Sequence, residues 1–258
     1  MKVTSRNRKV QIMKKQILNM ALVLLVAGVT QAADTPPPIP VVAKDAKTLV
    51  GVPRPQSDNV RGRTEQFNAL AKAGGFDVLF IGDSITHLWE QHGKDVWEKR
   101  IALFKAANFG IGGDTTQTVI WRLDNGNLTG KLDPKIIVLM LGTNNAGQST
   151  PEETAAGVGA ILERIHTRFP KAKVLLFPIF ARSNPGTVLR KINDDVNQIM
   201  SKYDGHWNIK YVDINPKLTD ANGNRLPDYY WDETPLTAKG DEVWAEALVP
   251  EFEAILKK

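Results

Sequence analysis

Short polar motifs follow three apolar runs of the sequence, and the first motif contains a serine suited to nucleophilic catalysis. Gly82-Asp83-Ser84 stands between an apolar run and a stretch of helical character. At such a strand-to-helix turn, a serine hydroxyl lies beside backbone N–H groups and the positive end of a helix. Ser84 is therefore a candidate nucleophile. The alternative is that Ser84 only caps the helix that follows.

The second motif is rich in glycine. Gly110-Ile111-Gly112-Gly113-Asp114 also stands between an apolar run and a helical stretch. Glycines allow backbone N–H groups to approach an anion, which suits a phosphate or the oxyanion of an acyl transfer equally well. The alternative is a tight turn in which Asp114 or Thr115 caps the next helix. Neither a G-x-G-x-x-G fingerprint nor a Walker sequence is present, so a nucleotide site is disfavoured.

The third motif is Gly142-Thr143-Asn144-Asn145, which again follows an apolar run. An asparagine amide at this place could donate a hydrogen bond to the same oxyanion. Taken alone, the motif has an ordinary loop composition. It gains meaning only from its place after a strand.

Five apolar runs and six helical stretches alternate along the chain and must position these motifs. The apolar runs cover 77–81, 106–109, 136–141, 174–177 and 209–212. The helical stretches cover about 61–73, 85–100, 115–123, 152–168, 187–203 and 238–256. This alternation predicts an α/β fold, a three-layer α/β/α sandwich with a five-stranded parallel sheet. Ligands of such sheets bind beyond the carboxyl ends of the strands, where the three motifs lie.

In this order and at these spacings, the three motifs resemble the first three sequence blocks of the SGNH (GDSL-like) hydrolases. The resemblance covers about residues 60–256 and is strongest to the branch with platelet-activating-factor acetylhydrolase catalytic subunits and bacterial exported esterases. It implies a flavodoxin-like fold with Ser84 as the nucleophile. It also implies an oxyanion hole made by the N–H groups of Ser84 and Gly113 and the side-chain amide of Asn144.

The last block of the family is an aspartate, two residues, a histidine and then Leu-Thr, before the final helix. Four residues of the present sequence match its pattern: Asp232, Leu236, Thr237 and Gly240. Pro235 stands where the resemblance places the histidine, and Asp232 where it places the aspartate that orients it. Proline has no proton acceptor in its side chain, so Pro235 cannot activate Ser84 as a base.

Other residues could substitute for the missing base, each with a difficulty. His87 is three residues after Ser84, but its reach toward the attacking face is doubtful. Glu233 would be a poor match for a hydroxyl because of its low ordinary pKa. His206 is a weaker candidate than His87, and His92 and His166 are interpreted as ordinary surface or helix residues. The resemblance therefore implies a serine esterase of impaired activity, or a non-catalytic protein that binds a glycan or acyl ester.

Several neighbouring residues have supporting roles in this hypothesis. Asp83 is expected to support the turn, and Asp114 to order the glycine loop. Arg182 follows the fourth apolar run and could line the substrate cleft. Trp231, just before Asp232, could stack on a sugar ring or pack against the last helix. Glu233 and Asp241 are further departures from the family pattern on the same loop.

The first 32 residues contain six basic residues, no acidic residue and an apolar run from Ile17 to Val29. This pattern predicts a signal peptide over 1–32, because the run is too short for a membrane span. Translation could start at Met1 or Met13. A proline-rich arm or linker is expected over 33–59 and the hydrolase domain over 60–258. The mature protein is thus expected to be secreted or periplasmic.

Composition excludes several classes of function. Without the six basic residues of the signal segment, 27 basic residues face 28 acidic ones, a net charge of about −1 that gives no footprint for nucleic acid. The absence of cysteine excludes disulfides, zinc–thiolate sites and a thiol nucleophile. No cofactor or metal is predicted. The expected partner is a small-molecule or carbohydrate ester, with a short acyl group such as acetyl.

Overall fold

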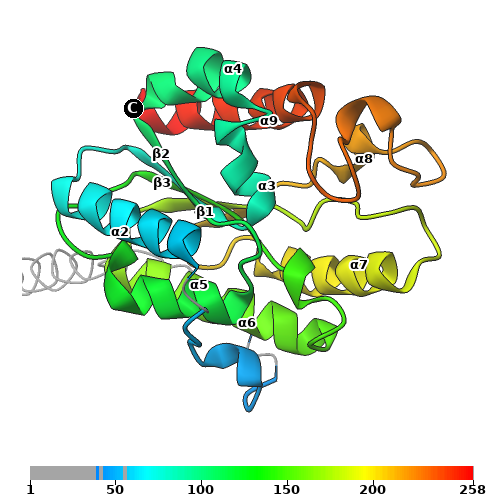
Figure 1. Cartoon of the computed structure of the whole chain (residues 1–258), viewed down its shortest axis with the longest axis horizontal. Coiled ribbons are helices and arrows are strands. Elements are labelled where there is room, and N and C mark those ends of the chain that lie inside the picture. Colours follow the sequence, from blue (N-terminus) through cyan, green and yellow to red (C-terminus); the bar gives the residue numbers. More distant parts are fainter. Residues whose placement is uncertain (1–38, 41–42, 55–56, 258) are drawn as a thin grey trace, which may run out of the picture. The chain divides into compact units, whose positions relative to one another are not determined.

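The apolar runs of the sequence form one parallel β-sheet. The computed structural model describes residues 39–40, 43–54 and 57–257. Its strands are β1 (Val78–Gly82), β2 (Ala106–Gly110), β3 (Ile136–Met140), β4 (Lys173–Leu176) and β5 (Ile209–Tyr211). They are ordered β2-β1-β3-β4-β5, and every neighbouring pair is parallel (Figure 1). The predicted five-stranded parallel sheet is confirmed, while the predicted signal peptide lies outside the described residues.

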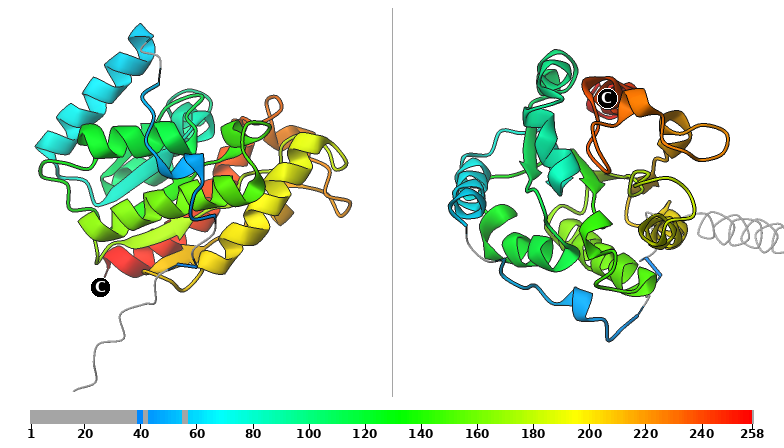
Figure 2. Two further views of the ribbon diagram at one scale, coloured as in Figure 1. Left: turned by 90° about the horizontal axis from the view of Figure 1, so that it is seen from below. Right: turned by 45° about the vertical axis from the view of Figure 1, so that its right-hand side comes forward.

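Helices cover both faces of the sheet. One face carries α2 (Asp58–Ala73), α5 (Thr116–Arg122), α6 (Pro151–Arg168) and α7 (Val188–Met200). The other face carries α3 (Ser84–His87), α4 (Lys94–Val96), α8 (Asn215–Leu218) and α9 (Ala238–Leu256) (Figures 1 and 2). Across the described ranges, no helix is long and apolar enough to cross a membrane.

Short 3₁₀ and π segments join these elements. The 3₁₀ segments are Lys47–Leu49, Leu88–Glu90, Ala102–Phe104, Thr143–Asn145, Ser201–Tyr203 and Pro227–Tyr229. The π segments are Trp97–Ile101 and Leu123–Asn127.

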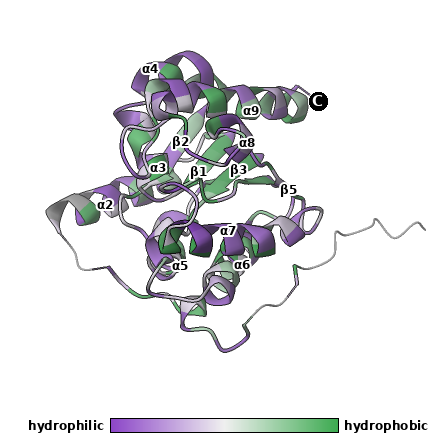
Figure 3. Cartoon of the chain, turned by 90° about the vertical axis from the view of Figure 1, so that its right-hand side faces the viewer, coloured by the Kyte–Doolittle hydropathy of each residue, from purple (hydrophilic) through white to green (hydrophobic). Residues whose placement is uncertain are grey.

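The layers follow from the alternation of side chains along each strand. In β1, Leu79 and Ile81 pack with Phe67 of α2 in one core, whereas Val78 and Phe80 pack in the other. Successive side chains of a strand point to opposite faces, so a strand covered on both sides must be apolar at every position. The sheet accordingly lies as a hydrophobic layer between helices with polar outer faces (Figure 3).

The helical stretch predicted over 85–100 is interrupted in the structure, so that prediction was wrong in its continuity. The chain leaves helical geometry at 91–93 and resumes in α4. A Cβ atom at Gly93 would overlap the carboxylate of Asp241 in α9 and lie 2.9 Å from the ring of Trp89. This close approach of Gly93 to α9 allows α4 to pack on that helix instead of extending α3.

The described part of the N-terminal arm lies across α5 and α6 (Figure 2). The Val52 N–H donates to the carbonyl of Gln117 in α5 at 3.1 Å. The Lys47 ammonium donates to the Gln148 carbonyl at 2.7 Å, and the Thr48 hydroxyl donates to the Glu153 carbonyl. These contacts bring the arm to the glycine-rich loop after β2.

Candidate active site

Ser84 is the first residue of α3 and follows β1 directly. The cap of α3 is Asp83, whose Oδ1 accepts a hydrogen bond from the Ile85 N–H at 3.0 Å. The alternative that Ser84 is only a cap is therefore wrong. The Ser84 hydroxyl is half-buried and makes no hydrogen bond to any described residue. It is thus free to react with a bound ligand.

Asp83 lies beneath this turn and is fully buried. Its second oxygen, Oδ2, has no hydrogen-bond partner among the described residues. Burial raises the pKa of Asp83 to about 7; the neighbouring Asp114 raises it further, while the hydrogen bond from Ile85 lowers it. The carboxyl group therefore stabilises the turn without carrying a permanent charge near neutral pH.

The glycine-rich loop after β2 contacts Ser84. A Cβ atom at Gly112 would lie 3.7 Å from the Ser84 Cβ and 3.7 Å from His87 Nδ1. Gly113 has a φ of 82°, a backbone conformation that favours glycine. Within the described residues, the Gly113 N–H donates to no acceptor. The loop that contacts the serine thus carries an unused N–H donor.

Arg54 of the N-terminal arm fixes the orientation of this peptide. Its guanidinium donates a hydrogen bond to the Gly112 carbonyl and lies 3.7 Å from an Asp114 carboxylate oxygen. In a trans peptide the carbonyl and the following N–H point in opposite directions. Because the carbonyl faces Arg54, the Gly113 N–H points away from the arm.

Asn144 brings a third donor to the same loop. It lies in the 3₁₀ segment after β3, and its Nδ2 donates to the Asp114 carbonyl at 2.9 Å. A primary amide has two N–H groups, so one remains for a ligand. The neighbouring Asn145 accepts from the Thr116 N–H at 3.0 Å, which ties the loops after β2 and β3 together.

Two buried arginines that the sequence reasoning missed hold the strand ends. Arg122 of α5 donates to Asp114 Oδ2 at 2.9 Å and to the Phe109 carbonyl at 2.7 Å. Arg63 of α2 donates to the Gly110 carbonyl at 2.9 Å. Burial lowers the pKa of Arg122, and the ion pair with Asp114 opposes that change. An arginine inside the apolar stretch 119–123 is the signal that could have revealed Arg122.

Pro235 and Asp232 lie on a tight loop before α9. Tyr230 and Leu236 pair as an antiparallel bridge, and the Trp231 N–H donates to the Pro235 carbonyl at 2.9 Å. The Asp232 side chain is exposed, and its carboxylate has no hydrogen-bond partner among the described residues. This carboxylate is therefore available to a neighbouring group.

Arg182 joins this loop to the loop after β3. Its Nη2 lies 3.4 Å from a carboxylate oxygen of Glu233, and its Nη1 donates to the Thr143 carbonyl at 3.4 Å. Glu233 is thus paired with a cation and faces Arg182.

Three histidines of the described residues already contact other groups. Nδ1 of His87 accepts from the Gly112 N–H at 3.3 Å, so the proton of the neutral ring resides on Nε2. Burial lowers the pKa of His87, and the positive charge of Arg63 lowers it further. The ring of His92 stacks on Trp231 at 4.9 Å, and that of His166 stacks on Trp207 at 5.0 Å. None of these three rings hydrogen-bonds the Ser84 hydroxyl.

Over the described ranges, no group of three or more His, Cys, Asp or Glu side chains could hold a metal ion. The groups that the three strand ends bring to this edge are a serine hydroxyl and backbone and amide N–H donors. That arrangement suits attack on an acyl group.

Comparison with known protein families agrees with this geometry. The model of the GDSL-like Lipase/Acylhydrolase family matches residues 80–243, which include all four motifs. The chain belongs to this family. Members of this GDSL-like family hydrolyse acyl esters, so the scaffold is that of an ester hydrolase.

The curated relatives of this GDSL-like chain include two acetylhydrolase subunits. It is 37% identical over 182 residues to platelet-activating factor acetylhydrolase IB subunit alpha2 of Rattus norvegicus, covering 70% of this chain and 76% of that protein. It is 36% identical over 159 residues to subunit alpha1 of Homo sapiens, covering 61% of this chain and 67% of that protein.

Solved structures share the fold of the GDSL-like chain. A GDSL-like lipase from Bacteroides thetaiotaomicron aligns with a TM-score of 0.57 at 20% identity, over 74% of this chain and 97% of that one. Axe2, an acetylxylan esterase from Geobacillus stearothermophilus, aligns with a TM-score of 0.55 at 18% identity, over 69% of this chain and 94% of that one. These similarities confirm the predicted α/β/α architecture.

Proposed function

We propose that the protein is an exported carboxylic-ester hydrolase in which Ser84 attacks a short acyl group, and that its turnover is low because Pro235 occupies the place of the general base. One observation carries the proposal. The Ser84 hydroxyl, which no described residue hydrogen-bonds, follows β1 and lies beside Gly112 of the glycine-rich loop. The same loop carries the unused N–H of Gly113 and is hydrogen-bonded by the amide of Asn144, so groups from three strand ends meet there.

These donors would stabilise the tetrahedral intermediate of acyl transfer. The N–H of Ser84 at the start of α3, that of Gly113 and the remaining N–H of Asn144 would bind the developing oxyanion. Removal of one such donor typically lowers turnover about 10²- to 10³-fold. The donors are fixed before substrate binds, because Arg54, Arg122 and the Asn144 bond to Asp114 hold their loops.

The proposed substrate is a short acyl ester of a carbohydrate. Acetyl is the acyl group in the names of the acetylhydrolase relatives. Trp231 directly precedes Asp232, is 69% exposed and has one ring face stacked on His92. An exposed indole beside the catalytic loop suits contact with a sugar ring. Export is proposed from the signal-like pattern of residues 1–32.

Labelling with a fluorophosphonate probe tests the nucleophile directly. We expect slow labelling of the parent, whose serine has no general base, and no labelling of Ser84→Ala, because the probe bonds to the serine oxygen. His87→Ala should label like the parent, since the acceptor nitrogen of His87 is occupied by Gly112. Equal labelling of the parent and Ser84→Ala would refute the proposal. Loss of labelling in His87→Ala would identify His87 as a relocated base.

Arg54 offers a second measurement on the oxyanion loop. Arg54→Ala frees the Gly112 carbonyl, so we expect the rate of Ser84 labelling to fall about tenfold through misorientation of the Gly113 N–H. Lys47→Ala is the matched control, because Lys47 lies on the same arm but contacts Gln148. Equal rates in both variants would show that Arg54 does not orient the loop.

A second function is favoured by Pro235 itself. Without a base, the same cleft and donors could bind an acetylated glycan without cleaving it. In that case an intact acetylated xylo-oligosaccharide binds the parent and Ser84→Ala equally well, and the probe labels neither.

A further inference from the structure

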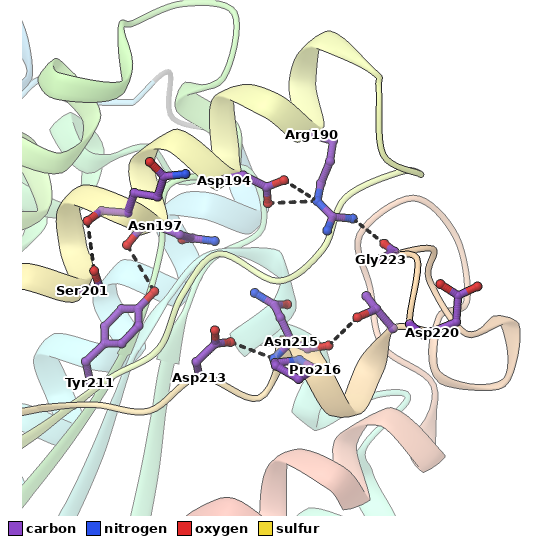
Figure 4. Close-up of a pocket in the computed structure, with 13 residues that line it drawn as sticks. Arg190, Asp194, Asn197, Ser201, Tyr211, Asp213, Asn215, Pro216, Asp220 and Gly223 are labelled. Carbon is purple, nitrogen blue, oxygen red and sulfur yellow. Dashed lines mark hydrogen bonds and ion pairs between the residues drawn. The ribbon is translucent and has the colours of Figure 1, made fainter.

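An open polar groove of about 740 Å³ lies between α7 and the segment that follows β5 (Figure 4). Tyr211 ends β5, and Asp213 and Asn215 follow it, so the groove opens at the carboxyl edge of the sheet. Ser84 follows β1 at the same edge. None of the residues discussed for the active site lines this groove, which is therefore a separate feature.

The floor of the groove is held rigidly. The Asn197 side chain accepts from the Ile179 N–H at 2.7 Å and donates to the Ile179 carbonyl at 2.9 Å. The Asn215 side chain donates to the same carbonyl at 3.2 Å and accepts from the Ala181 N–H at 2.9 Å. The segment fixed in this way continues into Arg182, which contacts the loop after β3. The groove is thus preformed and joined to the active-site edge by a fixed backbone.

Arg190 supplies a fixed donor. Its Nε donates to both carboxylate oxygens of Asp194 at 2.9 Å, and its Nη1 donates to the Gly223 carbonyl at 3.1 Å (Figure 4). The side chain is only 11% exposed, and its Nη2 has no hydrogen-bond partner among the described residues. One donor group of an immobilised guanidinium therefore remains for a ligand.

Asp213 and Gln198 supply groups of the complementary kind. One oxygen of Asp213 accepts from the Asn215 N–H at 2.9 Å, and the other has no partner within the described part of the chain. The amide of Gln198, which has both a donor and an acceptor, is exposed in the groove and is equally unpaired there. The ring of Tyr211 and the side chain of Pro216 add apolar surface beside them.

The charge of the groove selects the class of ligand. Three carboxylates line it, those of Asp194, Asp213 and Asp220, against the one guanidinium of Arg190. This excess of negative charge repels phosphates, uronates and anionic lipid headgroups. Donors and acceptors at fixed positions next to apolar surface suit a ligand whose hydroxyl groups both donate and accept and whose ring faces are apolar. A neutral sugar chain has this character.

We propose that the groove is a binding subsite for a neutral oligosaccharide, which holds the sugar chain while its acyl group lies at Ser84. The subsite rests on the proposed action on carbohydrate esters and extends it to a neutral chain that spans two regions of the sheet edge. Arg190 and Gln198 donate to sugar hydroxyl groups, and Asp213 accepts from them.

Calorimetric titration of the full protein with unacetylated xylohexaose and cellohexaose tests this subsite without any turnover. Tri-galacturonic acid serves as the anionic comparison. We expect at least one neutral hexaose to bind, and Asp213→Asn and Gln198→Ala each to weaken that binding about tenfold, as for a lost hydrogen bond. Asp195→Asn is the matched control on α7, because Asp195 pairs with Lys191 and does not line the groove.

Three results would overturn the subsite: no binding of either neutral hexaose, tighter binding of tri-galacturonic acid, or equal affinity in parent, Asp213→Asn and Gln198→Ala. Unchanged unfolding midpoints of the variants exclude misfolding as the cause of weaker binding. Ser84 labelling separates this proposal from the proposed function. If Ser84 is labelled but no sugar binds, the proposed subsite is refuted and the proposed esterase is not. If a sugar binds but Ser84 is not labelled, the proposed esterase is refuted and the subsite is not.

Discussion

Replacement of Pro235 by histidine is expected to raise the rate of p-nitrophenyl acetate hydrolysis about 10³-fold or more. A serine hydroxyl needs a base to remove its proton, and loss of the histidine from a serine–histidine–aspartate triad costs several orders of magnitude. With the base restored, the donors at Ser84, Gly113 and Asn144 would act on a far more reactive nucleophile. Initial rates with the purified parent and variant measure the gain.

The geometry of the loop favours this gain. The residue at 235 contributes its carbonyl to the bond from the Trp231 N–H, and histidine keeps that carbonyl. The carboxylate of Asp232 has no hydrogen-bond partner among the described residues, so it is available to orient an imidazole three positions later. Proline contributes no N–H to the loop, and its replacement therefore breaks no hydrogen bond.

Two further variants make the test decisive. Ser84→Ala combined with Pro235→His should hydrolyse no faster than the parent, because the gain requires the nucleophile. Asp232→Asn combined with Pro235→His should lose most of the gain, since the carboxylate orients the ring. A Pro235→His protein that folds normally but hydrolyses no faster than the parent would refute the assignment of the base position.

Substitution of Asp241 by asparagine is expected to stabilise the protein by a few kcal/mol at pH 8. Asp241 is 2% exposed in the first turn of α9, and no described residue hydrogen-bonds its carboxyl group. Burial raises the pKa of Asp241 from 3.8 to about 8. The folded state thus holds a proton that the unfolded chain releases above pH 4.

The sign of the pH dependence follows from this difference. Below pH 4, Asp241 is protonated in both states and costs the folded state no stability through ionisation. Between pH 4 and about pH 8, the free energy of unfolding falls by about 1.4 kcal/mol for each pH unit because of Asp241, and above that range its contribution is constant. The free energy of unfolding of the parent should therefore fall as pH rises through this window, and Asp241→Asn should remove that fall. Because the pKa of Asp83 is also raised, to about 7, the free energy of unfolding of both proteins should still fall somewhat as pH rises.

Urea unfolding at pH 5 and pH 8, followed by tryptophan fluorescence, to which the buried Trp89 and Trp244 contribute, measures the difference. Glu246→Gln is the matched control, because Glu246 is an exposed carboxylate of the same helix. Asp241→Asn should gain more at pH 8 than at pH 5, and Glu246→Gln should change little at either pH. The same gain at both values would show that Asp241 is ionised in the folded protein.

The fold could be predicted from the sequence because the strands are buried on both faces. Such strands are continuous apolar runs, and the runs at 136–141 and 174–177 lie within a residue of β3 and β4. The polar motifs then had to meet at one edge, because parallel strands end at the same side of the sheet. Local sequence was therefore sufficient to predict the parallel sheet and the edge at which the motifs meet.

The contacts that hold the site could not be predicted in the same way. Arg54 and Arg63 reach the glycine-rich loop and the end of β2 from the arm and α2, over separations that no local pattern encodes. The break at Gly93 depends on its contact with Asp241, about 150 residues later in the chain. The groove beside α7 likewise depends on side chains from α7 and from the segment after β5.

The hydrogen bonds of the buried Arg63 and Arg122 hold one part of the site, the loops after β1 and β2, independently of the loop with Pro235. The two parts can therefore evolve separately. These arginines hold the loops that present Ser84 and Gly113, whereas the loop with Pro235 is joined to the loop after β3 through Arg182 and Glu233 at the surface. Single substitutions in the Pro235 loop can therefore remove or restore a base while the N–H groups of Ser84 and Gly113 keep their places. A lineage built on this scaffold could pass between enzyme and receptor without refolding its core.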